Sequence, residues 1–399
     1  MLRNGLRVVA RGAAVLAFSV GGMAQAEPRP FRLLLWQPSD IRDGREVRFR
    51  AHVFGAQERS VLLARDPGRP TLWYLPTDAV RAGDDIRIYY QRVEKGLPEA
   101  TDQRVLCVGI LRGDRLVLPD LKLLPAPWGG PANVVLQRSP YRPTWGGFNV
   151  FQIARPAPDT WRLLYWDQPA AGEAGALLAV SHDGIHWRKD EARALFAEHN
   201  DAFTLVRDEA DGPALRWRLY QTRLEDWADK PFPDNLPGKR RVICLRTSPD
   251  LKVWTSQGTV LRPDGQDAPA AEFYLLKVFR YVDRWAGLLM VYYADPDRPN
   301  QHSALLRTEL IFSRDGRTWE RPFRYTDVGA WTYADPFEYG GHLCLVVHHE
   351  GSLCLLRTRP DGLACCGTDA EGTFCTRPFV VPDQPLVLNA DARGGLHPC

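Results

Sequence analysis

The sequence has 399 residues, of which 45% are hydrophobic and 25% charged, and its formal net charge is +3. This is the composition of an ordinary globular protein, long enough for one large domain or two small ones. Positive and negative residues are interleaved along the chain. There is therefore no basic stripe of the kind that binds nucleic acid, and net charge gives no argument for any partner.

The N-terminal segment has a different composition. Its first residues include arginines and no acid, an apolar run follows, and Ala24–Ala26 has the small-x-small form of a cleavage site. This order predicts a secretory signal peptide over residues 1–26. The apolar run, about eleven residues, is too short to span a bilayer. We therefore expect a soluble mature protein that is secreted or periplasmic; the alternative is an N-terminal anchor or a core helix.

Three segments share the form S-x-D-(G/L)-x-x-W, and their serines lie 67 and 65 residues apart. They are Ser181–Trp187, Ser248–Trp254 and Ser313–Trp319. A pattern at such a period indicates internal repeats. In the first segment we expect Asp183 to accept hydrogen bonds from its own turn, Gly184 to adopt a positive φ, and Trp187 to pack between repeats. This is a structural interpretation, and it gives the turn aspartates no catalytic role.

Each turn follows three short runs rich in aromatic and β-branched residues, which predict three strands. Weaker copies of this order lie over 71–118 and 332–362, and the one short helix candidate is 191–199. Five units of three to four antiparallel strands predict an all-β fold, a five-bladed β-propeller. The expected division is a signal peptide over 1–26, lead-in strands over 27–59, the propeller over 60–381 and a C-terminal strand or tail over 382–399.

The eight cysteines fit an oxidising compartment. Cys344 and Cys354 flank a predicted turn and are placed to face each other across a hairpin. No C-x-x-C pair occurs, which argues against a zinc ribbon. His348 and His349 are adjacent in a predicted strand, so they point to opposite faces and do not suit one ion. We favour disulfides over a metal site, leave their pairing open, and expect neither metal nor cofactor.

The serine–tryptophan turns, the YY-type second strands and the five units resemble the five-bladed propeller glycoside hydrolases, the broad group that includes families 32 and 43. The likeness covers about 60–381 and is one of architecture. A more detailed likeness is to secreted bacterial propeller proteins labelled glycosyl-hydrolase-like, whose C-terminal run resembles Pro385–Gly395. Here four residues follow that run, so we expect a truncated or diverged last sheet.

The resemblance implies carboxylates where the innermost strand of each blade meets a central funnel. Asp201 and Glu272 stand at the starts of two such predicted strands. Glycoside hydrolysis needs an acid for the leaving oxygen and a second carboxylate as nucleophile or base. We expect Glu272, followed by Phe273, to be the acid in an apolar wall, and Asp201 to stay ionised as base or nucleophile. The alternative is that both are structural acids that cap strands.

The set of carboxylates that the resemblance implies is incomplete in this sequence. The first-blade acid motif of these hydrolases is missing, and Arg65–Pro67 is a faint match to it. The second unit offers Asn149 in place of an acid. Ala334–Phe337 resembles an acid motif of family 43 but lies late in its predicted strand.

A substrate-binding group is expected around the acids. Its aromatic members would stack on sugar rings, the alternative being core packing, and its polar members flank Asp201 or stand in the second unit. The expected set is Trp73, Trp145, Asn149, His199, Asn200, Tyr274 and Trp331. The partner would then be a carbohydrate, bound by a monomer, with no nucleic acid and no membrane after signal cleavage.

Two other functions stay open at this point. The first is a non-catalytic propeller that binds glycans or a protein partner, which the missing first-blade acid favours. The second is a sialidase-like enzyme, which would need a cluster of arginines at the funnel; Arg142 and Arg155 are the candidates. Fold alone does not decide among these functions.

Overall fold

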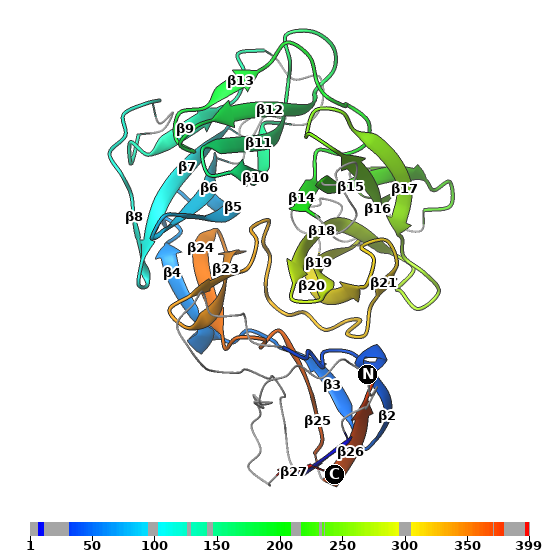
Figure 1. The fold of residues 1–399 in the computed structure, drawn as a ribbon. Coiled ribbons are helices and arrows are strands. Elements are labelled where there is room, and N and C mark those ends of the chain that lie inside the picture. The colour runs from blue at the N-terminus through cyan, green and yellow to red at the C-terminus, as the bar shows by residue number, and fades with distance from the viewer. Residues whose placement is uncertain are drawn as a thin grey trace.

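The computed structural model describes residues 7–11, 32–94, 103–125, 129–141, 147–208, 217–230, 234, 236–294, 305–369, 371–378 and 396–398. Five antiparallel sheets stand around a common centre, and a smaller group of strands lies to one side (Figure 1). These residues contain no α-helix and two short 3-10 helices, η1 (Pro38–Asp40) and η2 (Ala56–Glu58). The predicted five-bladed, all-β fold is confirmed.

The first four blades follow the chain from the ring centre outward (Figure 1). Blade 1 contains β5 (Leu72–Ala82), β6 (Asp85–Glu94), β7 (Gln103–Arg112) and β8 (Arg115–Val117), and β9 (Val134–Gln137) also pairs with β7. Blade 2 contains β10 (Asn149–Ala157), β11 (Thr160–Asp167), β12 (Gly175–Ser181) and β13 (Arg188–Asp190). Blade 3 contains β14 (Phe203–Arg207), β15 (Trp217–Asp226), β16 (Lys239–Ser248) and β17 (Thr255–Leu261). Blade 4 contains β18 (Ala271–Tyr281), β19 (Arg284–Tyr293), β20 (Leu305–Ser313) and β21 (Trp319–Glu320).

Blade 5 is built from both halves of the chain. It contains β22 (Phe337–Tyr339), β23 (His342–His349) and β24 (Ser352–Thr358), and its outermost strand is β4 (Arg59–Leu63) from the N-terminal side. Residue Leu353 pairs with Leu63 in this sheet. The ring is therefore closed by a strand that precedes every other strand of the propeller.

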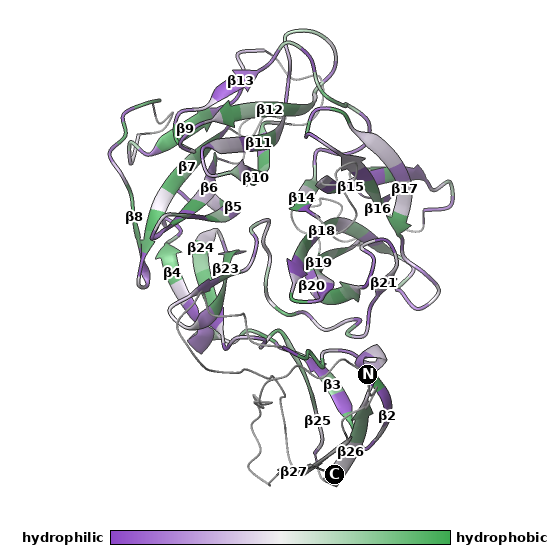
Figure 2. Cartoon of the chain, viewed as in Figure 1, coloured by the Kyte–Doolittle hydropathy of each residue, from purple (hydrophilic) through white to green (hydrophobic). Residues whose placement is uncertain are grey.

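The central strands are hydrophobic on both faces because each blade is covered by a neighbour on either side. In β19, Ala286 and Leu288 belong to a cluster shared with blade 5, whereas Leu289 and Val291 belong to one shared with blade 3. Successive strand residues point to opposite faces, so one strand supplies both clusters. Figure 2 shows the resulting contrast between the mainly hydrophobic inner strands and the hydrophilic outer strand β13.

The three serine–tryptophan turns share two hydrogen bonds made by their aspartate. In the first, Asp183 Oδ1 accepts from the N–H groups of Ile185 (2.8 Å) and His186 (2.9 Å), and Trp187 Nε1 donates to the carbonyl of Gly184 (3.1 Å). The same two aspartate bonds recur at Asp250 and Asp315. The turns connect the two outer strands of their blades, as the structural interpretation requires.

A second tryptophan accompanies each turn. In blades 2, 3 and 4 the turn serine pairs across the sheet with a tryptophan at the start of the second strand: Trp161 with Ser181, Trp217 with Ser248 and Trp285 with Ser313. At the turns of blades 2 and 4, a tyrosine of the preceding blade then donates a hydrogen bond to the turn. Tyr89 of blade 1 donates to the carbonyl of Gly184 (2.9 Å), and Tyr220 of blade 3 donates to that of Gly316 (2.7 Å). Each such bond fixes one blade against the next.

The turn of the fifth blade, at Asp361, has no tryptophan of its own. A tryptophan from the N-terminal side of the chain takes its place. Trp36, which is 2% exposed, donates from Nε1 to the carbonyl of Asp361 at 3.0 Å. This is the bond that Trp187 makes within its own turn. Trp36 also stacks on Tyr281 with ring centroids 5.0 Å apart. The segment before β4 is thus an integral part of the fifth blade.

The smaller group of strands lies outside the ring. There β2 (Ile41–Arg45) pairs with β26 (Glu371–Thr376), which also pairs with β1 (Arg7–Arg11), and β27 (Leu396–Pro398) pairs with β1. A second pair joins β3 (Arg48–Ala51) and β25 (Ala364–Gly367). The predicted propeller range 60–381 therefore includes residues that lie outside the ring, because the chain leaves the last blade after β24. The signal peptide over 1–26 stays a prediction.

Two local expectations are wrong. Cys344 pairs across the hairpin with Arg357 and Cys354 with Val347, so the two thiols are out of register and occupy different core clusters. The seven cysteines within the described ranges are all free thiols. The helix candidate 191–199 is irregular, since Phe196 packs into the core and its carbonyl accepts from the N–H of Ala176 (2.8 Å). Within those ranges no helix is long and apolar enough to cross a membrane.

Candidate functional site

The innermost strands begin at one end of the channel, because the blades are related by rotation about its axis. Trp73 is the second residue of β5, Asn149 opens β10, and Glu272 is the second residue of β18. Asp201 lies two residues before β14, and Trp331 precedes β22. The structure therefore brings most of the predicted site residues to one end of the ring. Trp145 lies outside the described residues.

Asp201 lies in a setting that favours its protonated form. Asn149 Nδ2 lies 3.5 Å from Asp201 Oδ2, a long hydrogen bond. Burial raises the pKa of Asp201, and the charges of Arg104 and Arg241 oppose that rise. Sequence analysis expected this carboxyl to be the ionised partner of the pair, whereas the local environment favours the acid role.

The two residues before Asp201 shape the backbone beside it. Asn200 Oδ1 accepts from the N–H of Ala202 at 3.1 Å, so its side chain caps the start of β14. His199 has φ +76°, a left-handed conformation that is uncommon for a non-glycine residue. Burial, followed by the charges of Arg246 and Arg223, lowers the pKa of His199. These surroundings favour the neutral imidazole.

Glu272 lies in a buried group of four charges. Its Oε1 is 2.7 Å from Lys230 Nζ, and its Oε2 is 2.9 Å from Arg241 Nη1. Asp234 completes the group, 2.8 Å from Lys230 Nζ and 2.9 Å from Arg241 Nη1. We call Lys230, Asp234, Arg241 and Glu272 the ion-pair quartet. Their side chains are between 0% and 4% exposed, so the predicted acid faces two cations and little solvent.

Three rings meet where blade 5 joins blade 1. His348 stacks on Trp73 with centroids 5.2 Å apart, and Trp331 meets it edge to face at 4.3 Å. His348 Nδ1 donates to the carbonyl of Tyr74 at 2.9 Å. Trp73 and Trp331 keep part of their surface accessible. Tyr274 belongs to blade 4 instead, and the Arg241 guanidinium lies 5.6 Å from its ring centre.

Sequence analysis missed a second carboxylate cluster, which lies about halfway along the innermost strands β5 and β18. Asp78, in β5, is 2% exposed, and its oxygens accept from the N–H groups of Ala79 (2.9 Å) and Ile153 (3.0 Å). The N–H of Asp335 lies 3.4 Å from Asp78 Oδ1. Lys277 Nζ lies 2.5 Å from Asp335 Oδ1. Burial raises the pKa of Asp78 to about 7, Asp335 adds to the rise, and Lys277 opposes it.

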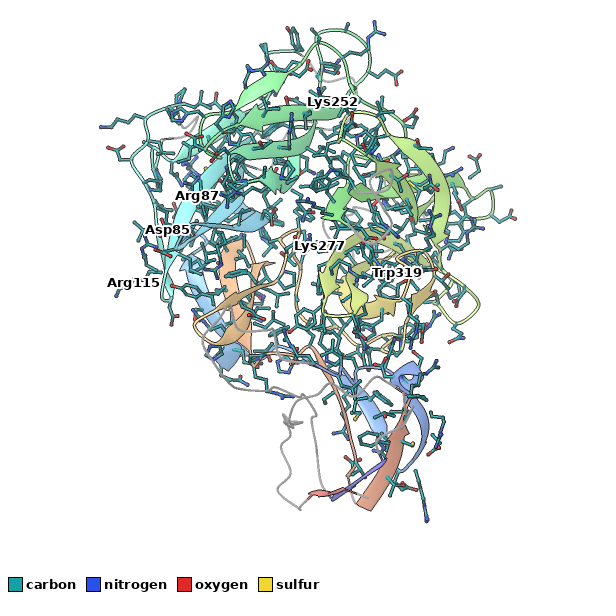
Figure 3. The ribbon with its side chains drawn as sticks, in the orientation of Figure 1. Asp85, Arg87, Arg115, Lys252, Lys277 and Trp319 are labelled. Carbon is teal, nitrogen blue, oxygen red and sulfur yellow. The ribbon has the colours of Figure 1, made fainter. Side chains whose placement is uncertain are left out.

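This cluster is open on one side. The side chain of Lys277 is fully buried, whereas that of Asp335 is 42% exposed. Figure 3 places Lys277 on the inner side of the ring, projecting from β18. Asp335 is therefore a solvent-accessible carboxylate held by a buried ammonium group.

Two signals in the sequence point toward this cluster. Asp335 belongs to the Ala334–Phe337 motif, which was noted but placed too late in its strand; β22 begins two residues after Asp335. Asp78 supplies a carboxylate in the first blade, in the middle of a strand rather than at its start. A bulge between Pro76 and Asp78 interrupts the pairing of β5 there, and bulges re-aim side chains.

The remaining predicted residues lie elsewhere. Asp66 caps a turn through the N–H of Gly68 (2.8 Å). Arg155 donates to the carbonyls of Arg81 and Pro158 and lies over the ring of Trp161, away from the acids. Arg142 is outside the described residues. No group of three or more metal-ligating side chains occurs in the described part of the chain.

Comparison with known proteins supports the fold. No protein-family model matches the sequence, and no curated protein matches it. Among solved structures, a complex of BT0996 with RGII aligns with a TM-score of 0.53 and 11% identity, over 77% of this protein and 93% of that one. The resemblance to five-bladed propeller glycoside hydrolases is confirmed at the level of fold.

Two further similarities are of the same kind. A GH130 structure, from a family described as mannoside phosphorylases that contains glycoside hydrolases, covers 78% of this chain and 97% of its own at 13% identity and a TM-score of 0.47. The GH32 β-fructofuranosidase BmSUC1 of Bombyx mori covers 84% and 66% at 14% identity and a TM-score of 0.46.

Proposed function

We propose that the protein is a secreted glycoside hydrolase that cleaves a glycosidic bond at the channel of the ring. The observation that carries this proposal is the contrast between two carboxyl groups on the inner side of the ring. The pKa of Asp201 is raised by burial. Asp335 is exposed and paired with Lys277. A carboxyl group whose pKa is raised by burial and a second one that is open to solvent suit the acid and the base of this reaction.

In this assignment Asp201 gives its proton to the leaving glycosidic oxygen as the C–O bond breaks. Asp335 either attacks the anomeric carbon or takes a proton from the water that attacks it. Tyr333 lies two residues before Asp335, and its ring packs 5.1 Å from that of Phe151 in blade 2. Asp78 links blade 1 to blade 2 through the N–H of Ile153 and lies 3.4 Å from the N–H of Asp335.

The rings and amides at the channel end would bind the sugar. Trp73 and Trp331 are partly accessible and are held by His348, so each presents a fixed apolar surface to sugar C–H groups. Asn149, His199 and Asn200 add polar groups beside Asp201. Fixed rings lose little conformational entropy on binding, which supports their use as a platform.

The second candidate function is a glycan-binding propeller without catalysis. The observation that favours it is Glu272, whose two oxygens are both engaged with buried cations. If Glu272 were the required general acid, hydrolysis would have no proton donor, because both of its oxygens are paired with cations. Sugar stacking on Trp73 and Trp331 would remain possible in either case.

The test is hydrolysis of a panel of aryl glycosides and polysaccharides by the mature protein and by the variants Asp201→Asn and Asp335→Asn. Cleavage of one substrate that both variants lose supports the enzyme. The matched control is Asp66→Asn, an exposed turn residue, which should leave activity unchanged. If no substrate is cleaved but a glycan binds, and binding survives both changes while Trp73→Ala abolishes it, the binding function replaces the enzymatic one.

A further inference from the structure

The innermost strands of neighbouring blades are joined by side chains that bond to the backbone of the next blade. In blade 1, Asp78 Oδ2 accepts from the N–H of Ile153 in blade 2 at 3.0 Å. In blade 2, Gln152 Oε1 accepts from the N–H of Leu205 in blade 3 at 2.8 Å. The N–H of Ile153 belongs to the peptide that follows Gln152. The backbone that Asp78 holds therefore also carries the side chain that holds blade 3.

The same arrangement continues into blades 4 and 5. The N–H of Leu205 belongs to the peptide that follows Thr204, and Thr204 Oγ1 donates to the carbonyl of Leu276 in blade 4 at 2.6 Å. That carbonyl belongs to the peptide that precedes Lys277. The ammonium group of Lys277 in turn lies 2.5 Å from Asp335 Oδ1, and Asp335 leads into β22 of blade 5. One contact thus passes from each blade to the next.

Asp335 returns this series of contacts to blade 1, because its N–H lies 3.4 Å from Asp78 Oδ1. The contacts therefore form a closed series around the ring, which we call the inner belt: Asp78, Gln152, Thr204, Lys277 and Asp335. The first four residues are between 0% and 3% exposed, whereas the side chain of Asp335 is 42% exposed. Hydrogen-bonded polar networks that are buried make their surroundings rigid. The inner belt is thus a buried support with one carboxylate open to solvent.

The contact between blades 3 and 4 fixes the strand that carries Lys277. A lysine ammonium stands on a flexible four-carbon stem, so its position depends on how firmly its backbone is held. Pairing of β18 with β19 is interrupted by a bulge between Phe273 and Leu275, just before this point. β18 is also the edge strand of its sheet, so the carbonyls on its inner side have no partner strand. Thr204 supplies a donor to one of them, that of Leu276.

We propose that Thr204 is a positioning residue: through the carbonyl of Leu276 it fixes the backbone of Lys277, and through Lys277 it holds the carboxylate of Asp335. This rests on the proposed function where activity is measured, because Asp335 is the base or nucleophile there. Thr204 is 0% exposed and so does not touch a substrate. Its effect on rate comes from geometry, since misplacement of a reacting group by about 1 Å can cost about 100-fold in rate.

The first test compares two hydroxyl groups that join the same two blades. Thr204→Val removes the inner hydroxyl and keeps the shape of the side chain, and Thr204→Ser keeps the hydroxyl. Tyr220→Phe is the matched control, because Tyr220 donates to the carbonyl of Gly316 at 2.7 Å in the outer turn. Thr204→Val should lower kcat at least about tenfold with KM within about threefold, while Thr204→Ser and Tyr220→Phe keep kcat within about threefold. Wild-type kcat in Thr204→Val, or equal losses in Thr204→Val and Tyr220→Phe, would overturn the proposal.

The second test does not need activity. Reductive methylation with formaldehyde and borohydride, read by peptide mass spectrometry, reports how often the buried Lys277 becomes accessible, and the exposed Lys252 serves as reference. Thr204→Val should raise the rate at Lys277 about tenfold or more relative to Lys252, because local opening becomes more frequent, and Tyr220→Phe should not. Equal rates at Lys277 in these two variants would refute the positioning role. A wild-type protein that cleaves no glycoside would remove the proposed function, and methylation would then decide whether Thr204 holds Lys277.

Discussion

Gly184 sits at the contact between blades 1 and 2, where alanine should be poorly tolerated for two separable reasons. Its φ is +76°, and an L-residue in that region costs about 1–2 kcal/mol. An added Cβ would also lie 2.6 Å from Tyr89 Oη and 2.9 Å from the ring of Trp161. Overpacking of this kind costs about 1–3 kcal/mol. Gly184→Ala should therefore lower the free energy of unfolding by about 2–5 kcal/mol.

Gly83 provides the control for backbone strain alone. It has φ +65°, and an added Cβ would meet nothing within 4 Å. Gly83→Ala should cost about 1 kcal/mol, so Gly184→Ala should cost about 1–3 kcal/mol more. Urea unfolding of the two variants and the wild-type protein measures the difference. Equal losses in both variants would show that the blade contact tolerates the methyl group and would refute the reasoning.

Five further variants test other parts of the structure. Trp36→Ala should lower the free energy of unfolding, measured in urea, by about 3–5 kcal/mol, as for other large buried residues. Trp36→Phe should lower it by about 1 kcal/mol, because the hydrogen bond to the fifth turn is lost. Losses near zero in both variants would place the N-terminal segment outside the fold. Because the pKa of Asp78 is raised to about 7, its contribution to stability is present below pH 4 and is lost as pH rises through 7. The unfolding free energy of the wild-type protein should therefore fall between about pH 4 and 7 relative to Asp78→Asn, and parallel curves would contradict this. Trp73→Ala and Trp331→Ala should each weaken glycan binding about tenfold or more by titration calorimetry, and unchanged affinity in both would mean that these rings are packing residues.

The five blades could be predicted because their signals are local. The turn bonds of Asp183 join residues two and three positions apart, and each strand shows its alternation within ten residues. The weaker first and fifth units were recognisable by their order of strands. Such features depend on neighbouring residues and are therefore written in short stretches of sequence.

The parts that escaped prediction depend on contacts between distant residues. Asp335 meets Asp78 across 257 positions, and Trp36 meets Asp361 across 325. Glu272 was correctly placed near the start of an innermost strand, but nothing adjacent to it reveals that Lys230 and Arg241 would engage both oxygens. Charge state in a site is set by the three-dimensional neighbours of a group, which short sequence patterns do not record.

Closure of the ring by β4 also sets an order of events during synthesis. Leu63 pairs with Leu353, which is made 290 residues later. At 5–20 residues per second, β4 waits about 15–60 s before its partner exists. During that time β4 has no partner strand, and unpaired strands can associate with other chains. A chain that crosses a membrane before folding avoids this delay, because all five blades become available together and the first and last strands can meet at once.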